Sequence, residues 1–271
     1  MTDINDGPHL LAPISKAELR AARRLHQRKG RLAAGEFLIE GAQAVREALL
    51  GPDEVRLLIV DDPDRHTDLL GYVDDVPVVG AGPDEIRQLA DTVTSQGIFA
   101  IVRDVPVRLA DIPWTARLVV ICAQVRDPGN AGTVIRCADA FGADGVVLTK
   151  GSVERTNPKT VRASVGSIFH LPVISGLSIA EAVDWAHDQG MQVFAADAGG
   201  TALDELPDAK LARPTAWVMG NEAWGLPDDV IELVDEVVSI PMWGAAESLN
   251  LSTAAAVCLY ASAVAQHHAI S

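Results

Sequence analysis

Five short apolar runs follow one another through the C-terminal half of the chain, and segments with helical patterning separate them. Strands of a parallel sheet are buried on both faces and carry uninterrupted apolar runs, whereas strands with one wet face alternate. The runs occupy residues 118–123, 145–149, 191–196, 216–219 and 237–241. The pattern predicts a parallel α/β sheet, with helices at residues 131–141, 158–168, 179–189, 228–234 and 248–267.

The first hundred residues show a second series of shorter elements. A helix is expected between the N-cap candidate Ser15 and the stop candidate Gly30, and further helices at 42–50 and 84–91. Strands are expected at residues 36–41, 55–60, 76–79 and 97–103. A stretch with Pro106 and Pro113 then separates the two series. We therefore expect a small α/β domain at 1–105, a linker at 106–115 and a larger α/β domain at 116–271.

Charge is distributed unevenly along this acidic chain, whose formal net charge is −15. Seven of its 22 basic residues lie between Lys16 and Arg31, with Glu18 as the single acidic residue there. Such a run is compatible with a solvated helix or with a surface that contacts nucleic-acid phosphates. The candidate RNA contacts are Arg23, Arg24, Lys29 and Arg31.

Several classes of protein are disfavoured by the sequence. No apolar run approaches the roughly 18 residues that a membrane span needs, and the start lacks a signal-peptide pattern, so we expect a cytoplasmic protein. Cys122, Cys137 and Cys258 lie far apart in apolar or helical segments, and the histidines show no ligand spacing. We therefore expect neither a metal site nor a redox pair.

Three polar, glycine-bearing loops follow strands of the predicted C-terminal sheet. Ligand sites of open α/β sheets lie at the carboxyl ends of the strands, so the three loops should converge there. They cover residues 124–136, 218–227 and 240–252, and their polar or glycine candidates are Asn130, Arg136, Gly220, Glu222, Ser248 and Asn250. The G-x-G-x-x-G fingerprint is missing, which disfavours a dinucleotide-dependent oxidoreductase.

Taken singly, each loop also has a purely structural interpretation. Asn130 is suited to capping a helix, and Arg136 to a surface ion pair. Ser248 is a good N-cap, which would put Asn250 in the first helical turn. Gly129 and Gly132 would let backbone approach a ligand. Trp224 and Trp243 suit either stacking on a base or packing beside a loop.

Three motifs together resemble the signatures of the SpoU/TrmH family of RNA ribose methyltransferases. They are NAGTVIRCADAFGADGV at 130–146, VMGNEAWGL at 218–226 and IPMWGAAESLNLSTAAAV at 240–257. More loosely, KGRLAAGEFLIEG at 29–41 resembles the start of a substrate-binding domain similar to ribosomal protein L30e. The overall likeness is to thiostrepton-resistance-type enzymes that act on large-subunit ribosomal RNA.

The resemblance implies a fold, a cofactor and a reaction. It implies that the C-terminal sheet ends in a deep trefoil knot, and that backbone groups of Gly220, Ile240 and Leu249 hold S-adenosylmethionine. It implies methylation of a ribose 2′-hydroxyl, with Arg136 stabilising the nucleophile, and assigns supporting roles to the motif positions Asn130, Glu222, Ser248 and Asn250. A homodimer acting on 23S rRNA is expected. A transfer RNA substrate and a non-catalytic RNA-binding protein remain the alternatives.

Overall fold

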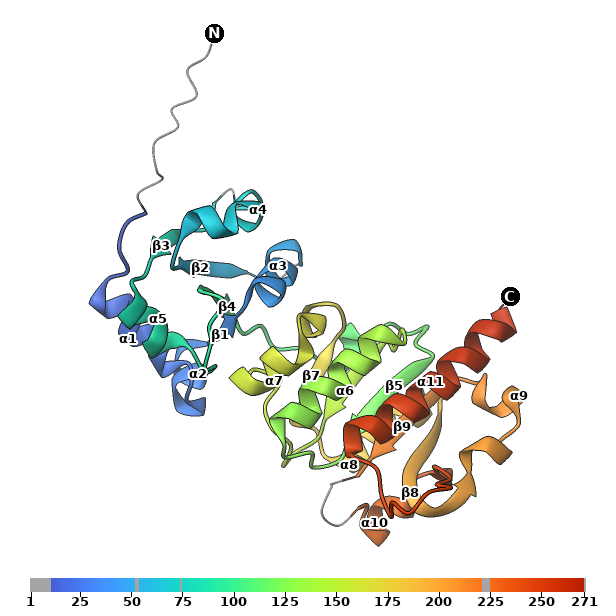
Figure 1. Ribbon diagram of the computed structural model, residues 1–271. Helices are drawn as coiled ribbons and strands as arrows, with labels where there is room; N and C mark the ends of the chain where they lie inside the picture. Colours follow the sequence, from blue (N-terminus) through green and yellow to red (C-terminus); the bar gives the residue numbers. More distant parts are fainter. Residues whose placement is uncertain (1–10, 52–53, 74, 221–224, 271) are drawn as a thin grey trace. The chain divides into compact units, whose positions relative to one another are not determined.

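A computed structural model of the protein describes residues 11–51, 54–73, 75–220 and 225–270. The chain forms two compact units, Met1–Val105 and Pro106–Ser271 (Figure 1). No helix among the described residues is long and apolar enough to cross a membrane.

The N-terminal unit is built on a four-stranded sheet in the order β1-β4-β2-β3. β4 runs antiparallel to both of its neighbours, while β2 and β3 are parallel. The strands are β1 (Glu36–Glu40), β2 (Val55–Val60), β3 (Val78–Gly80) and β4 (Ile98–Arg103). The helices are α1 (Lys16–Arg24), α2 (Arg28–Ala34), α3 (Ala42–Leu50), α4 (Thr67–Leu70) and α5 (Pro83–Leu89), with a 3-10 turn at Pro63–His66.

The basic segment is two helices and not the single helix predicted from Ser15 to Gly30. Ser15 caps α1 as expected, but α1 ends at Arg24 and Gly30 lies inside α2. A Cβ at Gly30 would lie 1.9 Å from the carbonyl oxygen of Arg24, so this glycine lets α2 fold back against the end of α1. It is a packing residue and not a helix stop.

The C-terminal unit is built on a six-stranded sheet in the order β10-β8-β9-β5-β6-β7, and every adjacent pair is parallel. All residues of β5, β6 and β9 are buried, as their apolar runs predicted. The strands are β5 (Leu118–Cys122), β6 (Gly145–Leu148), β7 (Val173–Ser175), β8 (Gln192–Ala202), β9 (Thr215–Met219) and β10 (Glu236–Ser239). The parallel α/β class is confirmed, and the trefoil knot stays a prediction.

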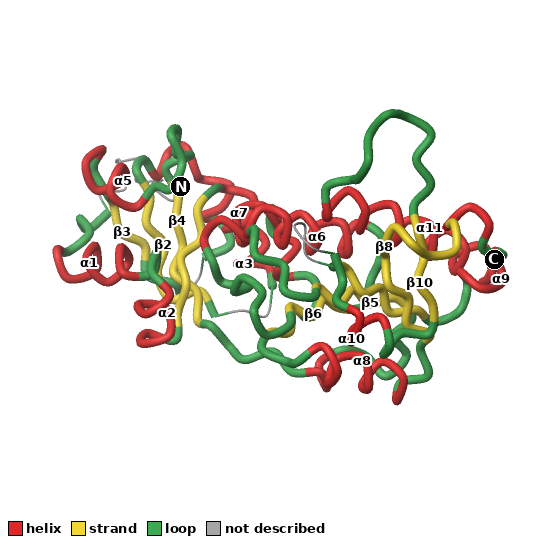
Figure 2. Tube along the Cα trace, turned by 90° about the horizontal axis from the view of Figure 1, so that it is seen from below, coloured by secondary structure: helices red, strands yellow, loops and turns green. Residues whose placement is uncertain are grey.

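Helices cover both faces of this sheet. Figure 2 shows α6 and α11 on one face and α8 and α10 on the other. The helices are α6 (Pro128–Ala140), α7 (Pro158–Ser164), α8 (Ile179–Asp188), α9 (Asp208–Leu211), α10 (Asp228–Ile231) and α11 (Leu251–Ile270), with 3-10 turns at Leu109–Asp111, Ser167–Phe169 and Leu203–Glu205. The indole nitrogen of the buried Trp217 donates to Ser262 Oγ at 2.9 Å, which ties α11 to β9.

Several predicted boundaries were wrong. The helix predicted at 158–168 ends at Ser164, because Val165 is left-handed (φ 52°) and a 3-10 turn follows. The helix predicted at 228–234 ends at Ile231. β7 and α9 were not predicted, and β8 extends beyond the predicted end at residue 196.

Candidate active site

The polar loops open on one edge of the C-terminal sheet because their strands end in register. Cys122, the last residue of β5, pairs with Met219, the last residue of β9. Met219 also pairs with Ala196 of β8. The chain after β5 and after β9 therefore leaves the sheet beside the middle of β8, at the carboxyl edge where a ligand is expected.

A pocket of about 370 Å³ lies at this edge. Four stretches of chain line it: the middle of β8, the end of β9 with the loop behind it, the end of β10, and the segment that enters α11. The three residues predicted to bind the cofactor are all in its wall, as is Ser248; these are Gly220, Ile240 and Leu249. Glu222 and Trp224 lie outside the described residues.

Close backbone contact explains the two glycines of this wall. A Cβ at Gly220 would lie 2.8 Å from the carbonyl carbon of Gly225. Gly225 has a φ of +65°, and a Cβ there would lie 2.9 Å from Asp197 Oδ2. Any larger residue at either position would push into the pocket or push its wall apart.

The pocket combines an apolar wall with two carboxylates. Met219, Val238 and Ile240 contribute apolar surface, and Asp197 and Glu247 contribute negative charge. The backbone N–H of Leu226 donates to Asp197 Oδ2 at 3.4 Å, which ties β8 to the loop after β9. Asp197 was not predicted, although an acidic residue within an apolar strand was an available signal. Such a lining suits a ligand with a flat apolar part and a positive charge.

A hydrogen bond between two asparagines joins the first and third polar loops. The side-chain amide of Asn250 donates from Nδ2 to Oδ1 of Asn130 at 3.0 Å, across 120 residues of sequence. Asn250 lies between Leu249 and Leu251, which both line the pocket. The first loop is thereby fixed to the pocket wall.

Each asparagine is placed by a helix cap that differs from the predicted one. Asp127, not Asn130, caps α6, because its Oδ1 accepts from the backbone N–H of Asn130 at 2.9 Å. That hydrogen bond is the main cause that lowers the pKa of Asp127 below 3.8. The Asn130 side chain is therefore available to Asn250.

The second cap lies at the start of α11. Asn250, not Ser248, caps this helix, because its Oδ1 accepts from the N–H of Ser252 at 2.9 Å. The same oxygen accepts from the Ser252 hydroxyl at 2.6 Å. Asn250 thus uses its oxygen on its own helix and its nitrogen on Asn130, whereas Ser248 faces the pocket.

Two further motif residues are exposed. Arg136 lies on α6, six positions after Asn130, with its side chain exposed. Trp243 is 85% exposed, so packing beside its loop does not account for it. Gly132, in contrast, is buried, and a Cβ at this position would collide with α7.

The predicted RNA contacts of the N-terminal unit divide into two groups. Arg23, Arg24 and Lys29 are exposed. Arg31 is only 3% exposed, and its Nη1 donates to the carbonyl oxygens of Leu25 and His26 at 3.0 and 3.1 Å. Its assignment to RNA was wrong, because the guanidinium satisfies the carbonyls where α1 ends.

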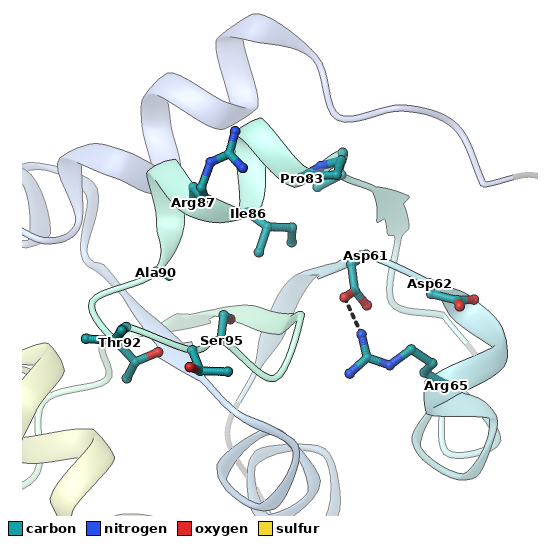
Figure 3. Close-up of a pocket in the computed structure, with 13 residues that line it drawn as sticks. Asp61, Asp62, Arg65, Pro83, Ile86, Arg87, Ala90, Thr92 and Ser95 are labelled. Carbon is teal, nitrogen blue, oxygen red and sulfur yellow. Dashed lines mark hydrogen bonds and ion pairs between the residues drawn. The ribbon is translucent and has the colours of Figure 1, made fainter.

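A second hollow, of about 790 Å³, lies in the N-terminal unit. It is lined by the chain after β2, the start of α5 and the loop before β4. Figure 3 shows Arg65 beside Asp61, and these side chains are 2.6 Å apart. Arg87, another lining residue, pairs with Asp84. No predicted site residue lines this hollow.

Metal ligands are not gathered anywhere in the described part of the chain: no three His, Cys, Asp or Glu side chains there are placed to hold a metal ion. Two exposed histidines have carboxylate partners instead. His170 Nδ1 is 2.8 Å from Asp139, and His187 Nε2 is 3.3 Å from Asp235.

Comparison with known proteins supplies the family. Residues 117–260 match the SpoU rRNA Methylase family, and residues 16–100 match the MRM3-like substrate binding domain. The chain is 36% identical over 244 residues to the 23S rRNA (guanosine(2553)-2′-O)-methyltransferase RlmP of Bacillus subtilis, covering 88% of this chain and 92% of that protein.

A second relative and a similar solved structure come from one organism. The 23S rRNA (uridine(2479)-2′-O)-methyltransferase of Streptomyces viridochromogenes is 33% identical over 252 residues, covering 87% of this chain and 85% of that protein. The crystal structure of the SpoU methyltransferase AviRb from the same organism, in complex with AdoMet, superposes with a TM-score of 0.83 and 30% identity, covering 95% and 99% of the two chains. With its pocket, its asparagine pair and these matches, the chain belongs to the SpoU rRNA methylase family.

Proposed function

We propose that this protein transfers a methyl group from S-adenosylmethionine to a ribose 2′-hydroxyl of 23S ribosomal RNA. One observation carries the proposal. The segment between Ser248 and Leu251 lines the pocket and is hydrogen-bonded, through Asn250, to Asn130 on the helix that bears the exposed Arg136. A ligand in the pocket and a ribose beside α6 would therefore lie on two sides of one short segment.

The pocket suits S-adenosylmethionine. Gly220, Ile240 and Leu249 would hold the cofactor through backbone groups, and the apolar wall would cover the adenine. Asp197 and Glu247 match the positive charges of its sulfonium and amino group. When bound, the cofactor supplies an electrophilic methyl group on a cationic sulfur.

The nucleophile presents the difficult part of the reaction. A ribose hydroxyl is almost wholly protonated near neutral pH, so its proton must pass to solvent as the methyl group is transferred, and the site must stabilise the developing alkoxide. A guanidinium is a cation with several N–H donors, and we assign Arg136 to electrostatic and hydrogen-bond stabilisation of that oxygen. Asn130, held by Asn250, orients the ribose or its phosphate. Glu222 and Ser248 are assigned to organising the second and third loops.

The N-terminal unit supports an RNA substrate. Its match to a substrate-binding domain covers both basic helices, and Arg23, Arg24 and Lys29 are exposed on them. The names of the two relatives specify different nucleotides of 23S rRNA, so we propose no target nucleotide for this protein. A ribosomal substrate is consistent with the cytoplasmic location predicted from the sequence.

We also propose a homodimer that forms through α11. Val257 and Tyr260 are 37% and 57% exposed on this helix, and the Tyr260 ring packs edge-on against Phe141 with centroids 5.5 Å apart. Light scattering in solution should give twice the chain mass of 28.7 kDa. The monomer mass at micromolar concentration would contradict the dimer.

The deciding experiment is transfer of labelled methyl groups from S-adenosylmethionine to unmodified 23S rRNA and, separately, to unmodified transfer RNA, both transcribed in vitro. Label at one alkali-resistant position of the 23S rRNA is expected, because a 2′-O-methyl group blocks cleavage at that phosphodiester. Label in transfer RNA alone would show that the substrate is transfer RNA and not 23S rRNA. No label in either RNA, despite cofactor binding, would favour a non-catalytic RNA-binding protein.

A further inference from the structure

The contact between α6 and α7 is close enough to fix the register of the two helices. A Cβ at Gly132 of α6 would lie 2.4 Å from the carbonyl oxygen of Thr160 and 2.6 Å from the Cβ of Ala163. The backbone of α7 therefore rests on α6 with no side chain between them. The position of Lys159, directly before Thr160, follows from this contact.

Lys159 lies over the start of the first polar loop. Its Nζ is 3.4 Å from Asp127 Oδ2, and it would be 3.8 Å from a Cβ at Gly129. Asp127 holds the backbone N–H of Asn130 at 2.9 Å through its other oxygen. Asp127 therefore contacts both the Lys159 ammonium and the backbone of Asn130. Lys159 itself comes from a segment outside the three motif loops.

This ammonium retains capacity for another ligand. The Lys159 side chain is 52% exposed, and among the described residues the ammonium is paired with Asp127 at the long distance of 3.4 Å. An ammonium carries three donors, so two of them can meet an anion from solvent. A phosphate oxygen suits a compact, flexible point charge of this kind.

The surroundings of Lys159 in the sequence are basic, unlike the rest of the unit. Residues 116–170 contain seven basic and four acidic residues, whereas residues 171–271 contain two basic and 14 acidic residues. An approaching polyanion would therefore be attracted to the α6–α7 side of the unit and repelled by the remainder.

We propose that Lys159 binds a phosphate of the RNA substrate next to the nucleotide whose ribose is methylated. The inference rests on the proposed function, because it takes the substrate to be RNA. Lys159 would hold the phosphate, and Asn130 and Arg136 would then meet the ribose of that nucleotide. It is an RNA-binding residue of the same site and not a member of the three motifs.

The test compares Lys159→Ala and Lys159→Arg with the wild-type protein. Binding to 23S rRNA transcribed in vitro is measured by filter retention across a salt series. Arg213→Ala is the matched control, because Arg213 is exposed just before β9, at the opposite edge of the sheet, and its hydrogen bonds to described residues are made by its backbone N–H and carbonyl oxygen. Cofactor affinity, methyl transfer and melting temperature are measured on each variant.

Loss of one phosphate contact lowers the slope of log K against log salt by about 1. The ratio of wild-type to Lys159→Ala affinity should therefore fall about fourfold between roughly 50 and 200 mM salt. Lys159→Arg and Arg213→Ala should keep the wild-type slope, and cofactor affinity should be unchanged in all three variants.

An unchanged slope in Lys159→Ala would overturn the inference. A lowered melting temperature with that unchanged slope would identify Lys159 as a structural partner of Asp127. Lys159 would also be identified as a structural partner if adding Asp127→Asn to Lys159→Ala restored the melting temperature while the salt slope stayed at the wild-type value. Failure of the proposed function is seen separately, as absence of methyl transfer by the wild-type protein while the salt slopes remain measurable.

Discussion

The two parts of the C-terminal unit carry opposite charge. Residues 171–271 contribute most of its acidic side chains and most of the pocket lining, including Asp197 and Glu247. Residues 116–170 carry an excess of basic side chains and include α6 and α7. The net charge of −15 is therefore a poor guide to the field at any one surface of this protein.

The difference matches the two substrates of the proposed reaction. S-adenosylmethionine carries positive charges and would enter the acidic part, while RNA is a polyanion and would lie on the basic part. The hydrogen bond between Asn130 and Asn250 joins the two parts where the substrates must meet. An acidic protein can hold RNA if its basic side chains are concentrated on the part that meets the RNA.

The largest expected effect comes from Arg136, which lies in the basic part, residues 116–170. Arg136→Ala should lower kcat for methyl transfer by about 10²–10³-fold, the usual result of removing one donor to a developing oxyanion. Cofactor affinity should be nearly unchanged, because Arg136 does not line the pocket. Single-turnover transfer and calorimetric titration of S-adenosylmethionine measure the two quantities.

Arg213→Ala is again the control for loss of one exposed guanidinium. Wild-type turnover by Arg136→Ala would remove Arg136 from the nucleophile. A parallel loss of cofactor affinity would show that the basic part also contributes to cofactor binding.

The acidic side is tested at Gly220. Gly220→Ala would place a Cβ 2.8 Å from the Gly225 backbone. The wall must shift to accept this Cβ, and the Kd for the cofactor should rise roughly tenfold if that shift weakens binding by about 1.4 kcal/mol. RNA binding should be unchanged. Gly199→Ala is the control, because nothing lies within 4 Å of a Cβ at that position of β8. Equal cofactor affinity in both variants would place the cofactor elsewhere.

The hydrogen bond that joins the two parts is tested by two substitutions of Asn250. Asn250→Ser keeps a side chain that caps α11 but is too short to reach Asn130, whereas Asn250→Ala removes both contacts. The alanine variant should lose about 2 kcal/mol of unfolding free energy, about 1 kcal/mol for each contact, and the serine variant about 1 kcal/mol. Both should lose methyl transfer by roughly fivefold, because one hydrogen bond of about 1 kcal/mol positions Asn130.

Urea unfolding and initial rates of methyl transfer separate the two contacts. A serine variant with wild-type activity would mean that the asparagine pair does not position the ribose. A serine variant as unstable as the alanine variant would mean that Asn250 is not the effective cap.

Much of the fold followed from the sequence because burial on both faces leaves a plain trace in it. The apolar runs at β5, β6 and β9 correspond to fully buried strands. β7 was not predicted because its apolar run is short: only three residues lie between Pro172 and the next turn. The basic run suggested one exposed helix, and the turn after Arg24 that buries Arg31 depends on contacts that propensity does not encode.

For the candidate site, the sequence indicated which loops lie near one another but not the contacts that their residues make. Asp127 and Asn130 are both good caps, as are Ser248 and Asn250, and the path of the incoming chain decides between them. Gly132 showed the same ambiguity, because a glycine needed for helix packing looks like one needed for a ligand. Asp197 joins the pocket only through the pairing of β8 with β9.

The smallest expected effect concerns Asp127, an acidic residue in the basic part. Its pKa is lowered by the N–H of Asn130, and Lys159 adds attraction. A carboxyl whose pKa is lower in the folded state stabilises the fold above its unfolded pKa of about 3.9 and loses that contribution as pH falls through the lower folded value. Asp127→Asn keeps a capping oxygen without a charge, so it should unfold with less dependence on pH below about 5.

The stability difference between the wild-type protein and Asp127→Asn should shrink between about pH 5 and 3, and should stay under about 1 kcal/mol because the carboxylate is half exposed. Urea unfolding at several pH values measures it, and a difference that is constant with pH would contradict the assignment of the shift to folding. The same variant sharpens the comparison of charges. Removing this anion leaves Lys159 with one partner fewer, so RNA should bind more tightly if the basic part receives it and equally if it does not.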